Sequence, residues 1–132
     1  MEHNSSGKFE SAFLTVEIPA NNSVMLSSLA GAKAGIWVAH GEGRFVSTDA
    51  TRKPNVALKY LYNSYPGNPN GSEGAIAGIC SADGRHLAMM PHLERAVFPW
   101  QWAWGGDKAG SDATLWLQAF VNGRRWLEER KK

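Results

Sequence analysis

The chain has 132 residues, 43% of them apolar, and its 14 Lys and Arg against 12 Asp and Glu leave a formal charge of +2. These values exclude a disordered tail, a collagen-like repeat and a strongly basic nucleic-acid binder, and they fit one compact domain or part of one. The single cysteine, Cys80, excludes an intramolecular disulfide framework and zinc sites built from several thiolates. Apolar runs are short and no signal peptide is visible, so we expect no membrane span and a reducing, cytoplasmic setting.

Alternating and β-branched apolar residues predict a strand-rich chain. The expected strands cover residues 9–18, 34–45, 56–62, 75–80 and 85–90. The second of these breaks at the glycines of 41–43, and the last two flank an Asp-Gly turn over 81–84, which is a strong hairpin signal. The Pro-, Gly- and Asn-rich segment 65–72 is expected to be a loop.

Two helical segments complete the prediction. Capping side chains at 21–23 precede a short helix over 24–29, and a longer helix is expected over 111–130. One face of the long helix holds Trp116, Phe120, Gly123 and Leu127. This content suits an α+β domain or part of a larger α/β domain.

His92 and Glu94 follow directly on a predicted strand and are the strongest candidates for chemistry. In an extended chain, residues two apart project to the same side, so the two side chains can meet while Leu93 points into packing. A carboxylate fixes the tautomer of an imidazole and stabilises its charged form, as a general base requires. The same spacing is also common in solvated surface pairs, so the motif alone leaves both interpretations open.

Other residues give weaker signals. Cys80 lies within an apolar strand and is expected to be a buried, unreactive thiol with a raised pKa. His40 adjoins the 41–43 turn, where it either lines a pocket or caps backbone groups. The tryptophans of 100–104 alternate, which fits a ligand-stacking platform, a docking surface or a small aromatic core. The histidines show no metal-ligand spacing, so no metal site is expected.

Four ordered motifs together resemble the phosphoribosylformylglycinamidine synthase family, at the C-terminal end of its class I glutamine amidotransferase domain. The motifs are Asn4–Glu10, Val38–Arg44, Tyr65–Ser72 and Gly84–Arg95. The resemblance implies an α/β, flavodoxin-like three-layer domain. Residues 1–132 would be its strand-rich C-terminal fragment with a closing helix, without the upstream segment that carries the nucleophile.

In that family a Cys-His-Glu triad hydrolyses glutamine, and the ammonia serves a synthetase that uses ATP and magnesium to convert formylglycinamide ribonucleotide to its amidine in purine synthesis. The resemblance implies that His92 moves the thiol proton to the departing ammonia while Glu94 holds the ring. It implies that the glutamine pocket is lined by Asn4, Ser5, Ser6 and His40. The expected partners are glutamine and the remainder of the same polypeptide, with no nucleic acid or membrane. ATP and magnesium would bind the synthetase part, so no cofactor is expected in this fragment.

One departure and two alternatives accompany this resemblance. Leu93 stands where the family has proline, and because only proline fixes φ, the turn would be slightly looser. The 132-residue chain alone is expected to be inactive, since it lacks the nucleophile and oxyanion donors. The alternatives are a non-catalytic domain that docks a partner through Trp100–Trp104, and the stand-alone small glutaminase subunit of the same pathway.

Overall fold

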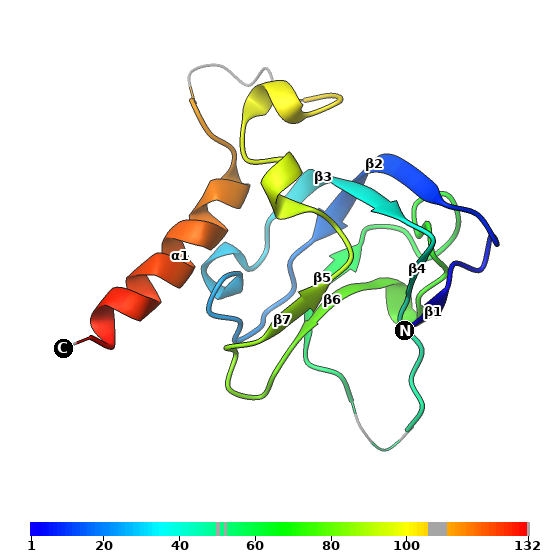
Figure 1. Ribbon diagram of the computed structural model, residues 1–132, viewed down its shortest axis with the longest axis horizontal. Coiled ribbons are helices and arrows are strands. Elements are labelled where there is room, and N and C mark those ends of the chain that lie inside the picture. The colour runs from blue at the N-terminus through cyan, green and yellow to red at the C-terminus, as the bar shows by residue number, and fades with distance from the viewer. Residues whose placement is uncertain (50, 52, 106–110, 132) are drawn as a thin grey trace.

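The structure is a computed structural model that describes residues 1–49, 51, 53–105 and 111–131. Antiparallel strands form its body, and a helix flanks them at the C-terminal end (Figure 1). The strands are β1 Glu2–His3, β2 Glu10–Glu17, β3 Lys33–His40, β4 Glu42–Arg44, β5 Val56–Tyr60, β6 Ile76–Cys80 and β7 Leu87–Met89. The helix is α1 Leu115–Glu129, and short 3₁₀ turns cover Ser27–Leu29, Glu73–Ala75, Leu93–Arg95 and Pro99–Gln101.

The described strands form a five-stranded sheet of order β3-β2-β5-β6-β7 and a two-stranded sheet of β1 and β4. Every described pairing in them is antiparallel. β2 and β3 pair over eight residues, from Glu10 opposite His40 to Glu17 opposite Lys33. β1 was not predicted. The other strands agree with the predicted ones to within a few residues, and the predicted break at 41–43 separates β3 from β4. The predicted strand-rich character is therefore confirmed.

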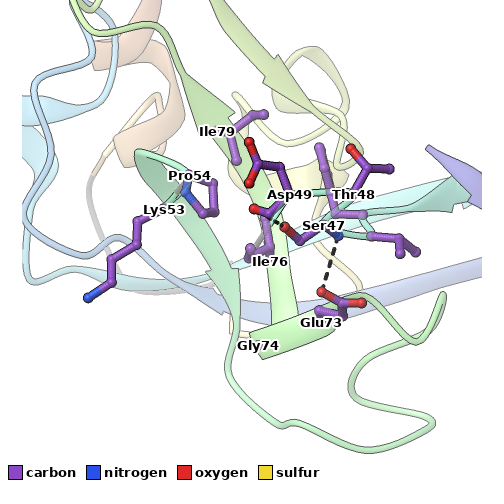
Figure 2. A pocket seen from close by; sticks show the side chains of 11 residues that line it. Ser47, Thr48, Asp49, Lys53, Pro54, Glu73, Gly74, Ile76 and Ile79 are labelled. Atoms are coloured by element: carbon purple, nitrogen blue, oxygen red, sulfur yellow. Dashed lines mark hydrogen bonds between the residues drawn. The ribbon is translucent and has the colours of Figure 1, made fainter. Parts of the chain in front are cut away.

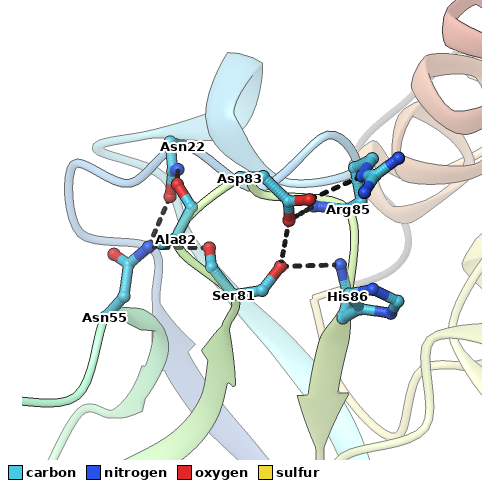
Figure 3. A network of polar contacts seen from close by, with 7 residues as sticks. All are labelled: Asn22, Asn55, Ser81, Ala82, Asp83, Arg85 and His86. Carbon is cyan, nitrogen blue, oxygen red and sulfur yellow. Dashed lines mark hydrogen bonds and ion pairs between the residues drawn. The ribbon is translucent and has the colours of Figure 1, made fainter.

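The predicted hairpin over 75–90 is present as β6 and β7 (Figure 3). Gly84 in its turn has a φ of 71°, which only glycine adopts readily. Hydrogen bonds from Ser81 and Arg85 hold the pKa of Asp83 well below its usual value. Asn22, from the loop before the first 3₁₀ turn, donates to the Ala82 carbonyl at 2.6 Å, so the hairpin tip is bound to a distant segment.

The hydrophobic core joins alternate residues of the sheet to the first turns of α1. Its fully buried side chains include Val16, Ile36, Val38, Leu58, Leu26 and Trp116. Burial of one such aliphatic side chain is worth about 1.5–3 kcal/mol, so these contacts dominate the stability of the fold. The loop 65–72, in contrast, buries polar groups. Asn70 Nδ2 donates to the Gly43 carbonyl at 2.8 Å and thereby fixes β4.

Only the first turns of α1 are buried along the face that holds Trp116, Phe120 and Leu127. Trp116 and Ala119 are fully buried, whereas Phe120 is 41% exposed and Leu127 is 57% exposed. The helix packs mainly with its first half, against the 3₁₀ turns at 27–29 and 93–95, and its C-terminal end extends away from the sheet (Figure 1). The buried residues Trp116 and Ala119 therefore follow i, i+3 spacing, and the face shared by Trp116, Phe120 and Leu127 is buried only at its start.

The predicted short helix over 24–29 is mostly a turn, with 3₁₀ geometry at Ser27–Leu29. The predicted capping side chains are used, because Asn21 Oδ1 accepts from the Ser23 amide at 2.9 Å. Within the described ranges, the structure holds no helix long and apolar enough to cross a membrane.

The outer edge of β3 is occupied by groups from the C-terminal third of the chain. The Trp116 indole donates to the Gly35 carbonyl at 2.8 Å, and the His92 amide donates to the Trp37 carbonyl at 2.8 Å. An edge strand otherwise presents unpaired carbonyls that invite another chain. These two bonds cover that edge and hold the backbone of His92 against the sheet.

Candidate functional site

His92 and Glu94 meet as their spacing predicts. His92 Nδ1 lies 2.8 Å from Glu94 Oε1, and the two side chains are 30% and 61% exposed. A carboxylate can only accept, so Nδ1 carries the ring proton and Nε2 keeps its lone pair. The pair can therefore take up a proton at Nε2 while the carboxylate stabilises the resulting charge.

The backbone that brings the pair together is only partly the predicted one. His92 is extended, with φ −101° and ψ 101°, but Leu93 begins a 3₁₀ turn that ends at Arg95. The turn forms because the His92 amide is bound to β3 while its carbonyl accepts from Arg95. Leu93 is 6% exposed and packs into the core, as predicted, so the two polar side chains on either side point outward.

His40 and Asn4, two of the four predicted substrate residues, are buried together. Asn4 Nδ2 donates to the carbonyls of Lys8 at 2.8 Å and His40 at 2.7 Å, and its Oδ1 lies 3.1 Å from His40 Nδ1. Burial lowers the pKa of His40, and repulsion from nearby His92 lowers it further. The charge of His92 therefore acts on His40, and Asn4 positions the His40 ring.

Ser5 and Ser6, the other two predicted substrate residues, lie in the turn before β2. Ser5 is exposed, and its amide donates to the Asn70 carbonyl at 3.1 Å. Ser6 Oγ accepts from the Lys8 amide at 3.3 Å. Among the described residues, neither serine forms a hydrogen bond with His92 or Glu94, so their substrate role stays a prediction.

Cys80 is buried, and burial raises the pKa of its thiol, as predicted. The Met90 amide, two residues before His92, bonds to the carbonyl of Ala77 on β6. Cys80 is three residues further along that strand, which corresponds to about 10 Å. Its Sγ instead contacts Asn22 Oδ1 at 3.4 Å, so Cys80 does not serve His92 as a nucleophile.

The tryptophans at 100–104 do not form one platform. Trp102 is half-buried, packs against Phe13 with ring centroids 5.7 Å apart and donates to the Ala96 carbonyl. Trp100 is 80% exposed and stacks on Phe98 at 6.1 Å. Trp104 is 52% exposed and meets Phe13 edge to face. Part of this segment is therefore aromatic core and part is surface.

A pocket of about 490 Å³ lies away from these residues, lined by residues 45–49, 53–54, 73–74 and two isoleucines of β6 (Figure 2). Ile76 and Ile79 contribute apolar wall, and Glu73 accepts from the Ser47 amide at 3.1 Å. Its lining includes neither His92 nor His40. In the part of the chain that is described, no group of three or more His, Cys, Asp or Glu side chains could hold a metal ion.

Glu10 is a residue near the site that the sequence reasoning missed. It is the register partner of His40, and its Oε1 is buried. The sequence offered one signal for it: an acidic residue within a predicted strand is unfavourable to bury unless it has a partner. Its pairing with His40 depends on the register of β2 and β3, which local patterns do not specify.

Comparison with known proteins places the whole chain in one family. Residues 1–127 match the family of the CobB/CobQ-like glutamine amidotransferase domain. The chain is 42% identical over 142 residues to phosphoribosylformylglycinamidine synthase of Homo sapiens, covering 98% of this chain and 11% of that protein. It is 46% identical over 140 residues to the Drosophila melanogaster synthase, covering 94% of this chain and 10% of that protein.

A solved structure shows the same architecture. A chain of the PurLQS structure from Thermotoga maritima superposes with a TM-score of 0.72 at 31% identity, covering 96% of this chain and 51% of that chain. The present chain therefore spans about half of the matched structure and about a tenth of the curated relatives. With its match over residues 1–127, the chain belongs to the CobB/CobQ-like glutamine amidotransferase family.

Proposed function

We propose that this chain contributes the histidine and glutamate of a glutamine-hydrolysing site. The observation that carries this is the 2.8 Å contact between His92 Nδ1 and Glu94 Oε1 in a chain of a glutamine amidotransferase family. In this role His92 Nε2 accepts the proton of an attacking thiol and returns it to the ammonia that leaves the carboxamide. Glu94 holds the ring in the required tautomer and stabilises the imidazolium.

The thiol in this mechanism belongs to another segment of protein. Cys80 is the sole cysteine of the sequence, and its Sγ is buried against Asn22. The chain alone would therefore bind and orient but not turn over glutamine. Asn4 would act by holding His40, and the exposed turn at Ser5 and Ser6 would line the substrate pocket.

The larger protein would be a phosphoribosylformylglycinamidine synthase. The names of the relatives at 42% and 46% identity support this assignment. In such an enzyme the ammonia would be consumed in the ATP-dependent conversion of formylglycinamide ribonucleotide to its amidine, with ATP and magnesium bound outside this chain. The antiparallel sheet described above would then be one portion of a flavodoxin-like three-layer domain completed by other segments.

The test is made in the complete enzyme that contains this chain. His92→Asn should lower glutamine-driven synthesis by at least about 100-fold, because a general acid–base group contributes about 10²–10⁴-fold. Ammonium-driven synthesis in the same preparation serves as the reference for folding of the synthetase part. His86→Asn is the matched control, because His86 is an exposed histidine on the hairpin. Glutamine-driven synthesis within twofold of wild type in His92→Asn would contradict the assignment.

A docking role for the Trp100–Trp104 surface is the second candidate function. It is favoured by one observation, the stacked and exposed pair of Phe98 and Trp100. Large exposed aromatic side chains are enriched where proteins contact partners. Trp100→Ser should leave the ratio of glutamine-driven to ammonium-driven synthesis unchanged if this surface only docks another segment.

A further inference from the structure

Two buried acceptor atoms near the candidate site lack hydrogen-bond partners. They are Glu10 Oε1 and His40 Nε2, and in the described ranges no other buried side-chain nitrogen or oxygen shares this property. Glu10 and His40 are register partners on β2 and β3, so their Cβ atoms lie about 5 Å apart on one face of the sheet. Buried polar atoms in proteins are nearly always bonded, so two unpartnered atoms in one place point to a bound group.

The hydrogen bonds of Asn4 determine which kind of atom His40 presents. Asn4 Nδ2 donates to two carbonyls, those of Lys8 and His40, which fixes the orientation of the amide. Its Oδ1 therefore faces His40 Nδ1 at 3.1 Å, and because Oδ1 only accepts, Nδ1 carries the proton. His40 is 6% exposed, and burial lowers its pKa, which favours the neutral ring, although nearby Glu10 acts in the opposite direction. Nε2 is consequently a lone-pair acceptor.

The chemistry of Glu10 and His40 determines which ligand can bind between them. A carboxylate oxygen and a neutral imidazole nitrogen both accept, so the bound group must carry several N–H or O–H donors. An anion is repelled by Glu10, and a cation with N–H donors gains both hydrogen bonds and charge pairing. These requirements describe ammonium, the ion of the nitrogen that hydrolysis of a carboxamide releases.

We infer that Glu10 and His40 form a binding site for ammonium beside the candidate catalytic pair. The identity of the ligand as a reaction product rests on the proposed glutamine hydrolysis, whereas the site itself rests on the two acceptors. The His92 amide is bound to the carbonyl of Trp37, three residues before His40 on β3, so the site lies on the same strand that holds the backbone of His92. Glu10 is thereby assigned a role in product binding.

Histidine-labelled protein gives a direct test. The imidazole ¹⁵N resonances of the 132-residue chain are followed during addition of ammonium chloride, with potassium chloride at equal ionic strength as the reference. The His40 Nε2 resonance should move to saturation with ammonium only. His3 and His86, both exposed, serve as internal controls. Loss of a hydrogen bond to a charged group should weaken the apparent Kd in Glu10→Gln by at least about tenfold.

A second measurement uses the complete enzyme, in which ammonium should inhibit glutamate formation from glutamine. Glu10→Gln should raise the ammonium concentration for half-inhibition by about tenfold, in line with the lost charged hydrogen bond. Glu17→Gln is the matched control, because Glu17 lies at the other end of β2 opposite Lys33. Its half-inhibition concentration should equal that of the wild type.

Each outcome has a distinct meaning. A His40 resonance that ammonium does not move, or that potassium moves equally, overturns the site, as does an unchanged half-inhibition in Glu10→Gln. The two acceptors would then be bridged by water. Continued glutamine hydrolysis by His92→Asn overturns the proposed function instead, and it leaves the ammonium response of His40 as a separate result.

Discussion

Replacing Gly84 with alanine tests how much the contact between the β6–β7 hairpin tip and the 22–24 segment contributes to the free energy of unfolding. Gly84 has a φ of 71°, and a Cβ at this position would overlap the carbonyl oxygen of Asn22 and lie 2.9 Å from its carbonyl carbon. The Gly84 carbonyl also accepts from the Val24 amide at 2.9 Å. Alanine must therefore push the hairpin tip and the 22–24 segment apart.

The magnitude follows from two contributions. The left-handed conformation costs an L-residue about 1–2 kcal/mol. Displacement of Asn22 also weakens its hydrogen bonds with Ala82 and Asn55, and it weakens the bond from the Val24 amide to the Gly84 carbonyl. Each hydrogen bond contributes about 1 kcal/mol. We expect Gly84→Ala to lower the free energy of unfolding by about 3 kcal/mol, which is a large part of the stability of a small domain.

Gly31→Ala separates the two contributions. Gly31 has a φ of 88°, but a Cβ there meets no atom within 4 Å, so only the conformational cost of about 1–2 kcal/mol applies. Urea unfolding followed by tryptophan fluorescence gives both values. Equal destabilisation by Gly84→Ala and Gly31→Ala would refute the reasoning, because it would show that the hairpin tip accommodates a methyl group without strain.

Three further predictions concern burial. Burial lowers the pKa of His40 from 6.5, so the unfolded chain takes up the proton at a higher pH than the folded chain. The free energy of unfolding should therefore fall as the pH drops below 6.5. Urea titrations should show a smaller fall in His40→Asn. The Cys80 thiol should react with a disulfide reagent at least about tenfold more slowly in the native protein than in urea, and equal rates would contradict its burial. Trp116→Ala should cost about 3–5 kcal/mol and Phe120→Ala less than about 1 kcal/mol in urea unfolding, because only Trp116 is fully buried.

Local patterns predicted the elements whose signals are local. The Asp83-Gly84 turn and the alternation on either side specify the β6–β7 hairpin, because a turn that requires positive φ fixes the register of its strands. The buried face of α1 was not predictable in this way. Hydrophobic spacing identified a helix, but which residues are buried depends on where the helix contacts the sheet and the 3₁₀ turns.

The same distinction applies to the candidate site. His92 and Glu94 are two residues apart, so their contact follows from short-range geometry whether the backbone is extended or 3₁₀. Glu10 and His40 come together only through the register of β2 and β3, and the orientation of His40 depends on a third segment through Asn4. Such a constellation becomes visible only when the tertiary structure is known.

In the turn that carries His92 and Glu94, a buried side chain restricts the backbone at position 93 where a proline ring could do so. Proline would restrict φ at position 93 by its ring. Here Leu93 is held by its buried side chain, while the bonds that close the turn use the amides of Arg95 and Ala96, and the His92 amide is bound to β3. The first residue of such a turn needs no amide donor. Leu93 thus constrains the turn through its side chain in the core, whereas a proline would constrain it through the backbone itself.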